Sequence, residues 1–219
     1  PASGPIPPDI SGYDPALKTS AQLYDPAAAR ALLDKYGYKD RDGDGFRELP
    51  DGKPLTLERW SSPSSASRQS DELWKKNMNA IGLKIEFKTD KLPEMRKLAR
   101  QGKIPMRGDG WNADYPDAEN FMQLLYGPNV GQANYARFNL PEFNKLYDEA
   151  RRLPDSPQRT KLFSRMTELV VAYAPWRVTI NDLEDTFAHP WAHNYVPHPI
   201  RSQTWMFIDV DDAARAKAR

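Results

Sequence analysis

Short strands and amphipathic helices alternate between residues 55 and 111, and this alternation restricts the fold of the chain more than any other feature. The segments 55–60 and 83–87 place apolar and polar side chains in turn, with the period of a half-buried strand, and the segment 104–111 is placed as a third strand by its position after a helix. Each helical segment stops at a glycine. The expected order is a strand over 55–60, a helix ending at Gly82, a strand over 83–87, a helix over 92–101 and a strand over 104–111. This order indicates parallel strands joined by crossover helices.

Capping signals predict three more helices. Asp25 before Pro26 begins a helix that runs to about Tyr36, and Ser156 before Pro157 begins another that runs to Tyr173. A third helix is expected over 141–151. The C-terminal part is expected to hold a strand over 176–180, a proline-rich connection over 190–199, a short strand over 204–210, and a tail over 211–219 that starts a helix or is disordered.

The composition suits one sizeable α/β domain and excludes several function classes. The 219 residues include 31 basic and 30 acidic side chains, so the net charge is +1 and no basic surface for nucleic acid is indicated. No apolar run is long enough to span a bilayer. Cysteine is absent, which excludes thiol chemistry and leaves the compartment open.

Residues 106–121 carry the strongest functional signal. They place Trp111 three residues before Asp114, where a strand is expected to pass into a polar turn and then into a helix opening near Asp117. Ligands of open α/β sheets bind outside the carboxyl ends of the strands. A carboxylate beside an aromatic ring suits a small cation with an apolar neighbour. The alternative is structural: Trp111 belongs to the core and Asp114 caps the next helix.

The acidic loop that starts at Asp40 matches the beginning of a calcium loop. Asp40, Asp42, Asp44 and Asp51 occupy positions one, three, five and twelve. However, position twelve of an EF-hand requires a bidentate glutamate, and Pro50 interrupts the helix that would follow. A solvated turn held by aspartate side chains is the alternative to calcium at Asp40, Asp42 and Asp44.

Other catalytic and metal patterns are absent from the sequence. Proline separates or flanks the three histidines, which argues against a zinc site. There is no nucleophile elbow, phosphate-binding loop or dinucleotide fingerprint, so no enzyme is indicated. Pairs of carboxylates could be drawn as a glycosidase acid and base, but nothing sets their separation.

The segment 110–117 (Gly-Trp-Asn-Ala-Asp-Tyr-Pro-Asp) resembles the Gly-Trp-x-x-Asp segment of the family 5 extracellular solute-binding proteins, which serve peptide-importing ABC transporters. Three other segments fall in the order that this family shows: residues 3–15, the acidic loop 40–48, and residues 139–144 with Leu146. The resemblance therefore covers essentially the whole chain.

The resemblance implies a fold and a place in a longer protein. Family members are more than twice this long and close two lobes around a ligand. The expected fold is an α/β lobe of the periplasmic-binding-protein type (type II), with a mixed, mainly parallel sheet flanked by helices. Residues 1–190 would form the C-terminal ligand-binding lobe, and residues 191–219 a hinge return and tail that pack on the missing N-terminal lobe.

The resemblance also implies a function without catalysis. A periplasmic protein would capture a peptide and deliver it to an ABC permease in the inner membrane. The residues carried over as ligand-binding are Trp111, Asn112, Asp114, Asn134 and Tyr135, and Asp114 would pair with the amino terminus of the peptide. Because family members also bind nickel complexes, haem or sugars, the ligand class stays open. The alternative function is a calcium-stabilised structural or interaction module without a transport role.

Overall fold

The computed structural model describes residues 2–20, 23–182, 185, 187–196 and 204–217. The chain divides into two compact units, each made of segments that are distant in sequence. The first unit contains Pro1–Gln22, Trp111–Tyr126 and Leu140–Arg219, and the second contains Leu23–Gly110 and Gly127–Asn139.

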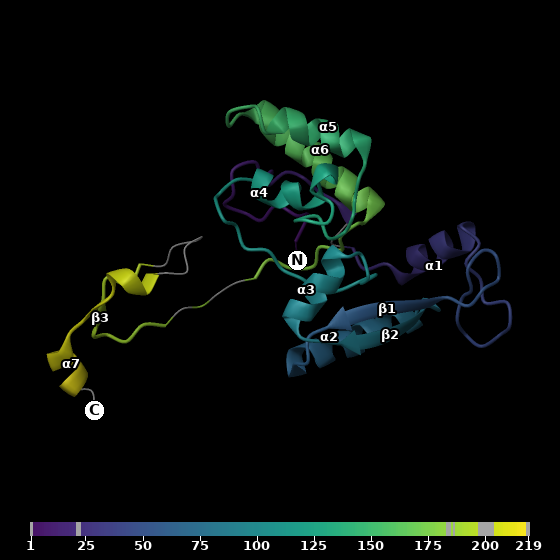
Figure 1. Ribbon diagram of the computed structural model, residues 1–219, viewed down its shortest axis with the longest axis horizontal. Coiled ribbons are helices and arrows are strands. Elements are labelled where there is room, and N and C mark those ends of the chain that lie inside the picture. The colour runs from purple at the N-terminus through teal and green to yellow at the C-terminus, as the bar shows by residue number, and fades with distance from the viewer. Residues whose placement is uncertain (1, 21–22, 183–184, 186, 197–203, 218–219) are drawn as a thin grey trace. The chain divides into compact units, whose positions relative to one another are not determined.

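The second unit is built on a parallel pair of strands, as the alternation predicted. β1 (Thr56–Ser61) pairs with β2 (Lys84–Thr89) in a register that runs from Thr56 opposite Lys84 to Ser61 opposite Thr89. Both strands lie side by side in Figure 1. The connection between them is α2 (Ser65–Asn79), which packs against β2, and α3 (Leu92–Arg100) follows β2. α1 (Pro26–Lys35) and a short 3-10 turn (Gly127–Asn129) complete the unit.

The predicted third strand over 104–111 is wrong as a strand. Its contact with the sheet is one isolated parallel bridge between Trp60 and Arg107, and Trp60 N donates to the carbonyl oxygen of Met106 at 2.8 Å. The direction of pairing agrees with the prediction. Pro105 has no amide hydrogen to donate to a ladder, and Gly108 and Gly110 disfavour an extended strand, so the pairing does not continue.

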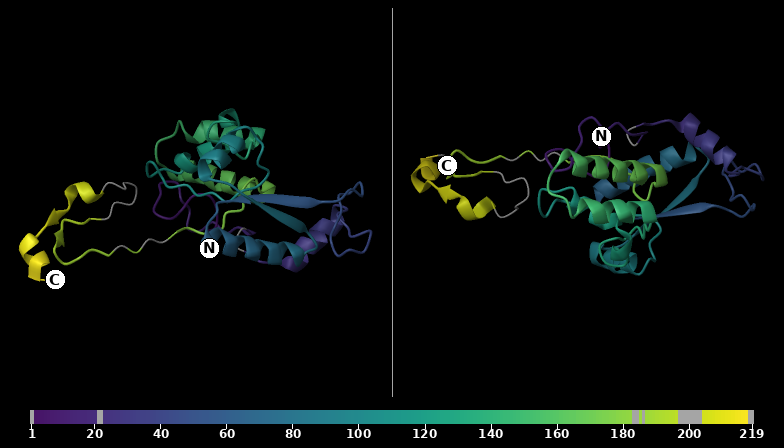
Figure 2. Two further views of the ribbon diagram at one scale, coloured as in Figure 1. Left: turned by 60° about the horizontal axis from the view of Figure 1, so that its bottom comes forward. Right: turned by 90° about the horizontal axis from the view of Figure 1, so that it is seen from above.

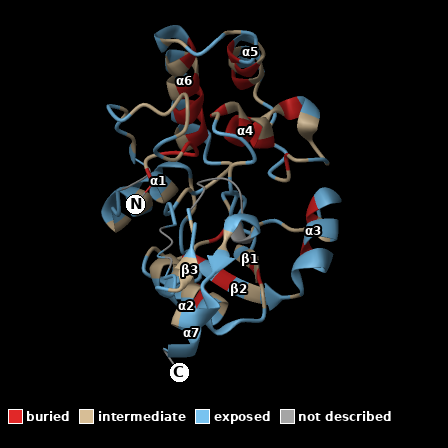
Figure 3. Cartoon of the chain, turned by 90° about the vertical axis from the view of Figure 1, so that its left-hand side faces the viewer, coloured by how far each residue is buried: buried red, intermediate tan, exposed pale blue. Residues whose placement is uncertain are grey.

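The first unit is helical and contains most of the buried apolar side chains. Its core contains α4 (Glu119–Met122), a 3-10 turn (Gln123–Leu125), α5 (Pro141–Ala150) and α6 (Pro157–Tyr173). α5 packs against α6 (Figures 1 and 2). Figure 3 shows the buried positions concentrated on α4, α5 and α6. Among the described residues, the largest apolar side chains that are fully buried are Met122, Leu125, Phe143, Phe163, Met166 and Val170. Burying side chains of this size contributes about 1.5–3 kcal/mol each.

The predicted helix ends are confirmed where a local cap is present. The carboxylate of Asp25 accepts from Ala28 N, and Ser156 Oγ accepts from Arg159 N at the start of α6. α3 ends at Arg100, directly before Gln101 and Gly102, and Gly102 has a φ of +71°. These elements form as the sequence predicts because their start and stop signals are local.

Two predicted strands near the C-terminus are not formed as expected. Residues 176–180 are not a strand, although the carbonyl oxygen of Thr179 accepts from Ala2 N at 3.2 Å. Residues 204–210 form a 3-10 turn (Thr204–Phe207) followed by the two-residue β4 (Asp209–Val210), which pairs antiparallel with β3 (Ala192–His193). A strand needs a neighbouring strand, which an alternating pattern does not provide.

The tail contains α7 (Asp212–Lys217), so a helix is formed where the sequence allowed either a helix or disorder. The expected connection over 190–199 lies partly outside the described residues, because 197–199 are not described. The predicted boundary at residue 190 concerns the longer protein and stays a prediction.

Candidate functional site

The loop that carries Trp111 and Asp114 lies against the N-terminal segment of the chain. Ser11 N donates to the carbonyl oxygen of Pro116 at 3.2 Å, and Ala118 N donates to the carbonyl oxygen of Ser11 at 2.8 Å. Gly12, with a φ of +92°, follows Ser11; a Cβ atom there would lie 2.7 Å from Phe163 and 2.8 Å from Ala118. Only glycine fits this close approach without strain. The segment around Ser11 and the segment 116–118 are therefore held together by backbone hydrogen bonds next to the site.

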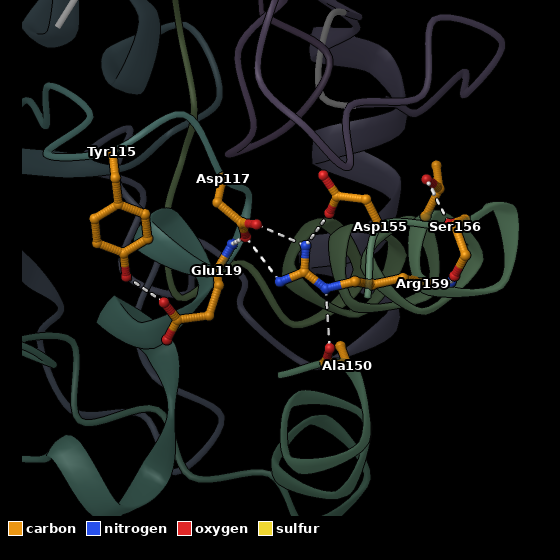
Figure 4. A network of polar contacts seen from close by, with 8 residues as sticks. Tyr115, Asp117, Glu119, Ala150, Asp155, Ser156 and Arg159 are labelled. Atoms are coloured by element: carbon orange, nitrogen blue, oxygen red, sulfur yellow. Dashed lines mark hydrogen bonds and ion pairs between the residues drawn. The ribbon is translucent and has the colours of Figure 1, made fainter. Parts of the chain in front are cut away.

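A buried arginine on α6 holds the second half of the loop. Arg159 is 6% exposed, and its guanidinium donates to both carboxylate oxygens of Asp117, at 2.6 and 2.9 Å. It also bonds Asp155 at 2.9 Å and the carbonyl oxygen of Ala150 at 2.9 Å, as Figure 4 shows. The hydrogen bonds to Asp117 raise the pKa of Arg159 above its ordinary value. The bidentate pair fixes Asp117 in one geometry.

Two tyrosines engage the next carboxylate. The hydroxyls of Tyr115 and Tyr147 both donate to Glu119, the first residue of α4. Burial, assisted by the hydrogen bond to Glu119, raises the pKa of Tyr115 to about 12 and also raises that of Tyr147. Both tyrosines therefore keep their protons at neutral pH and remain donors to Glu119.

Asp114 is the exposed carboxylate of this loop that has neither an ion pair nor a tyrosine donor among the described residues. Asp114 is exposed, and among the described residues its side chain accepts only from Asn120 Nδ2, at 3.2 Å. It is also absent from the ion pairs of the described chain, whereas Asp117 pairs with Arg159. Asp117 also accepts from Glu119 N at 2.8 Å. The N-cap position of α4 is Ala118, so Asp114 does not cap this helix.

Trp111 is 44% exposed, so it is not a core residue. Its indole Nε1–H donates to Asn120 Oδ1 at 2.8 Å, and the same oxygen accepts from Asp114 N at 3.1 Å. Trp111 and Asp114 are thus brought together through one buried asparagine. The geometry can present a ring face and a carboxylate to the same ligand.

The remaining predicted ligand residues have different surroundings. Asn112 is exposed in the same loop as Trp111. Asn134 and Tyr135 belong to the second unit. Asn134 is fully buried and bonds the backbone of Phe138 at 2.8 Å and 3.3 Å, which is a loop-closing arrangement, and the guanidinium carbon of Arg107 lies 5.1 Å from the centre of the Tyr135 ring. Their contact with a ligand stays a prediction.

A comparison with protein-family models identifies the chain. Residues 1–133 match the model of the bacterial extracellular solute-binding proteins, family 5 Middle. The chain belongs to this family. The resemblance expected from residues 110–117 is confirmed.

Individual relatives of this family 5 chain cover nearly all of it. Heme-binding protein A of Haemophilus influenzae is 30% identical over 211 residues, which are 96% of the chain and 37% of that relative. Di/tripeptide-binding protein 1 of Pseudomonas aeruginosa is 27% identical over 199 residues, 83% of the chain and 34% of the relative. The chain thus spans about a third of the length of the curated relatives it matches.

The solved structure of the oligopeptide-binding protein AppA from Bacillus subtilis in complex with a nonapeptide superimposes with a TM-score of 0.72. The identity is 18%, and the match covers 80% of the family 5 chain and 35% of AppA. This likeness confirms the expected α/β fold of the periplasmic-binding-protein type. The relatives named here are solute-binding proteins. No helix in the described part of the chain has the length and apolar character required to cross a membrane.

Sequence reasoning missed Asn120 and Arg159 in this family 5 chain. Asn120 directly precedes the apolar pair Phe121 and Met122, and a polar residue beside such a pair is a weak signal for a buried hydrogen-bonding role. Arg159 is 42 residues from Asp117, so no local pattern indicates their pairing.

The acidic loop of the family 5 chain gathers a different set of carboxylates from the one predicted. Ligand oxygens of Asp40, Asp42, Asp44 and Glu48 all lie within 4.8 Å of one another. Asp51 is not in this group, because it turns toward Lys53 Nζ at 2.6 Å, and this contact lowers its pKa. Glu48 occupies position nine of the loop, so the first three predicted ligands are brought together with a residue that sequence reasoning missed. Calcium itself stays a prediction.

Proposed function

We propose that this chain is the C-terminal lobe of the substrate-binding component of an ABC importer, and that it captures a peptide through Trp111 and Asp114. The observation that supports the proposal most directly is the state of the three carboxylates between Asp114 and Glu119. Asp117 is paired with Arg159 and Glu119 accepts from two tyrosines, whereas Asp114 is exposed and has no cationic partner among the described residues. A cation supplied by a ligand would give the Asp114 carboxylate the ionic partner that it lacks among the described residues.

A peptide carries a positively charged α-ammonium group, which is the kind of partner that Asp114 lacks among the described residues. Its α-ammonium group would pair with Asp114, and an unpaired ammonium buried by closure of the protein would cost several kcal/mol. Trp111 would offer its ring to the cation or to an apolar side chain of the peptide. Two curated relatives are named for haem and for di- and tripeptides, so haem is the competing ligand class.

The other partners belong to the same proposal. An N-terminal lobe of the longer protein would supply the opposite wall of the ligand site, and residues 191–219 would return to it. Ligand would favour the closed state of the two lobes, and a permease in the inner membrane would recognise that state. The protein would act in the periplasm and bind its ligand without chemical change.

The deciding experiment is Asp114→Asn in the full-length protein. The substitution keeps the shape of the side chain and removes the charge that the ammonium needs. We expect peptide affinity, measured by isothermal titration calorimetry, to fall about thirtyfold or more, or about 2 kcal/mol, with the melting temperature nearly unchanged. Asp9→Asn is the matched control, because Asp9 is exposed in the same unit and its φ of +63° is tolerated by asparagine.

An acetylated peptide tests the same contact from the ligand side. N-acetylation removes the ammonium, so it should weaken binding to the parent protein and have little further effect on Asp114→Asn. Equal affinity of the parent protein for free and acetylated peptides would refute the pairing. Native mass spectrometry of protein purified without refolding identifies the ligand class: a ladder of peptide masses supports the proposal, and a haem mass overturns the ligand.

A second candidate function rests on the acidic loop. We propose that calcium bound by Asp40, Asp42 and Asp44, with Glu48, stabilises the chain as a structural or interaction module. The clustering of four carboxylates supports this role, because oxygen ligands in such a group suit calcium. The same carboxylates accept backbone N–H groups of the loop, which is the arrangement of the alternative turn. Stabilisation by calcium without any peptide or haem binding would favour this function over transport.

A further inference from the structure

Asn120 makes three hydrogen bonds that join the two halves of the candidate site. It is the second residue of α4 and is fully buried. Its Oδ1 accepts from the Trp111 indole at 2.8 Å and from Asp114 N at 3.1 Å, and its Nδ2 donates to Asp114 Oδ2 at 3.2 Å. One side chain therefore contacts the ring, the backbone and the carboxylate of the two residues proposed to bind ligand.

The chemistry of these contacts suits a short neutral side chain that both accepts and donates hydrogen bonds, as asparagine does. The position needs an acceptor with two lone pairs for two N–H groups and a neutral donor for a carboxylate, on a short side chain. An aspartate would place a second negative charge about 3 Å from the carboxylate of Asp114, and its ionised form has no hydrogen to donate. A leucine of similar size would leave the indole N–H and the Asp114 amide without their acceptor.

The backbone of Asn120 is itself held in place. Asn120 N donates to the carbonyl oxygen of Asp117 at 3.0 Å, and Asp117 is clamped by Arg159. Glu119, the preceding residue, is engaged by two tyrosines. The backbone of Asn120 is thus fixed by the packing of the first unit. Its side-chain hydrogen bonds in turn restrict the positions of Trp111 and Asp114.

We infer that Asn120 is the positioning residue of the ligand site: it holds the Trp111 ring and the Asp114 carboxylate in the geometry that receives a cation, without touching the ligand. This inference rests on the proposed function, because it assigns Asn120 a role in the site formed by Trp111 and Asp114. A carboxylate held in place before binding has less freedom to lose when ligand arrives, which strengthens binding.

The first test needs no ligand. In ¹⁵N-labelled protein, the indole N–H signal of Trp111, assigned with Trp111→Phe, should shift and exchange faster with solvent in Asn120→Leu. The indole of Trp60 provides the internal control, because it donates to Glu58 in the second unit at 2.6 Å and should be unaffected. An unchanged Trp111 signal in the variant would overturn the inference.

The second test uses Asn120→Asp, which distinguishes positioning from general damage to the fold. Burial and the nearby Asp114 should raise the pKa of the introduced carboxyl, which favours its protonated form as the pH falls. When protonated, it can again accept from Trp111 and donate to Asp114. We expect affinity for a mixture of di- to pentaalanine peptides to fall at least tenfold at pH 7.5 and to recover to within about threefold of the parent at pH 5.

The peptide affinity of the parent protein is measured at the same two pH values. This reference accounts for any effect of pH that comes from other titrating groups. Affinity of Asn120→Asp equal to the parent at pH 7.5, or an equal loss at both pH values, would overturn the positioning role. If Asn120→Leu fails to fold, the pH recovery of Asn120→Asp decides the question. Equal peptide affinity of the parent and Asp114→Asn would instead refute the proposed function, and the Trp111 signal would still decide whether Asn120 holds the pair.

Discussion

Replacing Arg159 with methionine removes the buried cation that holds the site loop on α6. Methionine keeps a long apolar stem, so packing against Phe163, whose ring centre lies 4.7 Å from the guanidinium carbon, is partly retained. The substitution therefore reports mainly on the loss of the polar contacts to Asp117, Asp155 and Ala150.

The expected loss of stability follows from the burial of each partner. Removing one member of a buried ion pair costs about 3–5 kcal/mol, because the other charge is stranded. The Asp117 side chain is 23% exposed, so it can regain some water, and the lower end of this range applies. Asp155 is 67% exposed and adds little. We expect Arg159→Met to lower the free energy of unfolding by about 3 kcal/mol.

Urea denaturation of the chain, followed by far-ultraviolet circular dichroism, measures this loss. Asp155→Asn is the matched control and should change the unfolding free energy by less than about 1 kcal/mol. The double variant Arg159→Met, Asp117→Asn should lose about 1–2 kcal/mol less unfolding free energy than the sum of the two single losses. The reason is that the double variant no longer contains the unpaired Asp117 carboxylate. Hydrogen exchange of the α4 amides should accelerate in Arg159→Met.

A loss below about 1 kcal/mol in Arg159→Met, equal to that of Asp155→Asn, would refute this reasoning. Additive effects of the Arg159 and Asp117 substitutions would also refute it, because two residues that share a buried ion pair must show coupling.

Three further predictions concern other parts of the chain. Calcium should raise the melting temperature, a chelator should reverse the rise, and Asp42→Asn should abolish it; thermal scans without any shift would leave the acidic loop as a turn closed by aspartate side chains. The pKa of Tyr115 is raised to about 12 in the folded chain. The contribution of the Tyr115 hydroxyl to the free energy of unfolding should therefore be fully present below about pH 10 and be lost as the pH rises toward 12. Tyr115→Phe should flatten this fall in urea titrations at alkaline pH, and an unchanged slope would contradict the assignment. Ser156→Ala should cost about 1 kcal/mol by removing the cap of α6, whereas no change in the urea midpoint would show that this cap is dispensable.

Much of the fold could be predicted from the sequence because its signals are local. The start of α6 at Ser156 and Pro157 depends on residues within one turn of the helix, as does the start of α1 at Asp25. The parallel pairing of β1 and β2 follows from the crossover helix between them. The strand over 104–111 could not be predicted correctly, because a strand exists only where its backbone bonds a neighbour.

The candidate site also combines features that the sequence predicts with features that depend on tertiary packing. The spacing of Trp111 and Asp114 and the family they indicate are properties of the sequence. The sequence did not show which of several nearby carboxylates would remain exposed. Asp117 is neutralised by Arg159 from α6, and Glu119 is engaged by Tyr147 from α5, both through contacts between distant residues.

The sequence by itself thus determined the helices, the parallel pair of strands and the segment that carries the site, because each depends on neighbouring residues. Tertiary structure alone decided that Asp117 is paired and Asp114 is exposed. It also decided that Asn120 is buried where it can bond both Trp111 and Asp114. The physical reason is that burial and ion pairing depend on which distant segments pack together, and that packing sets which carboxylate of the loop stays exposed.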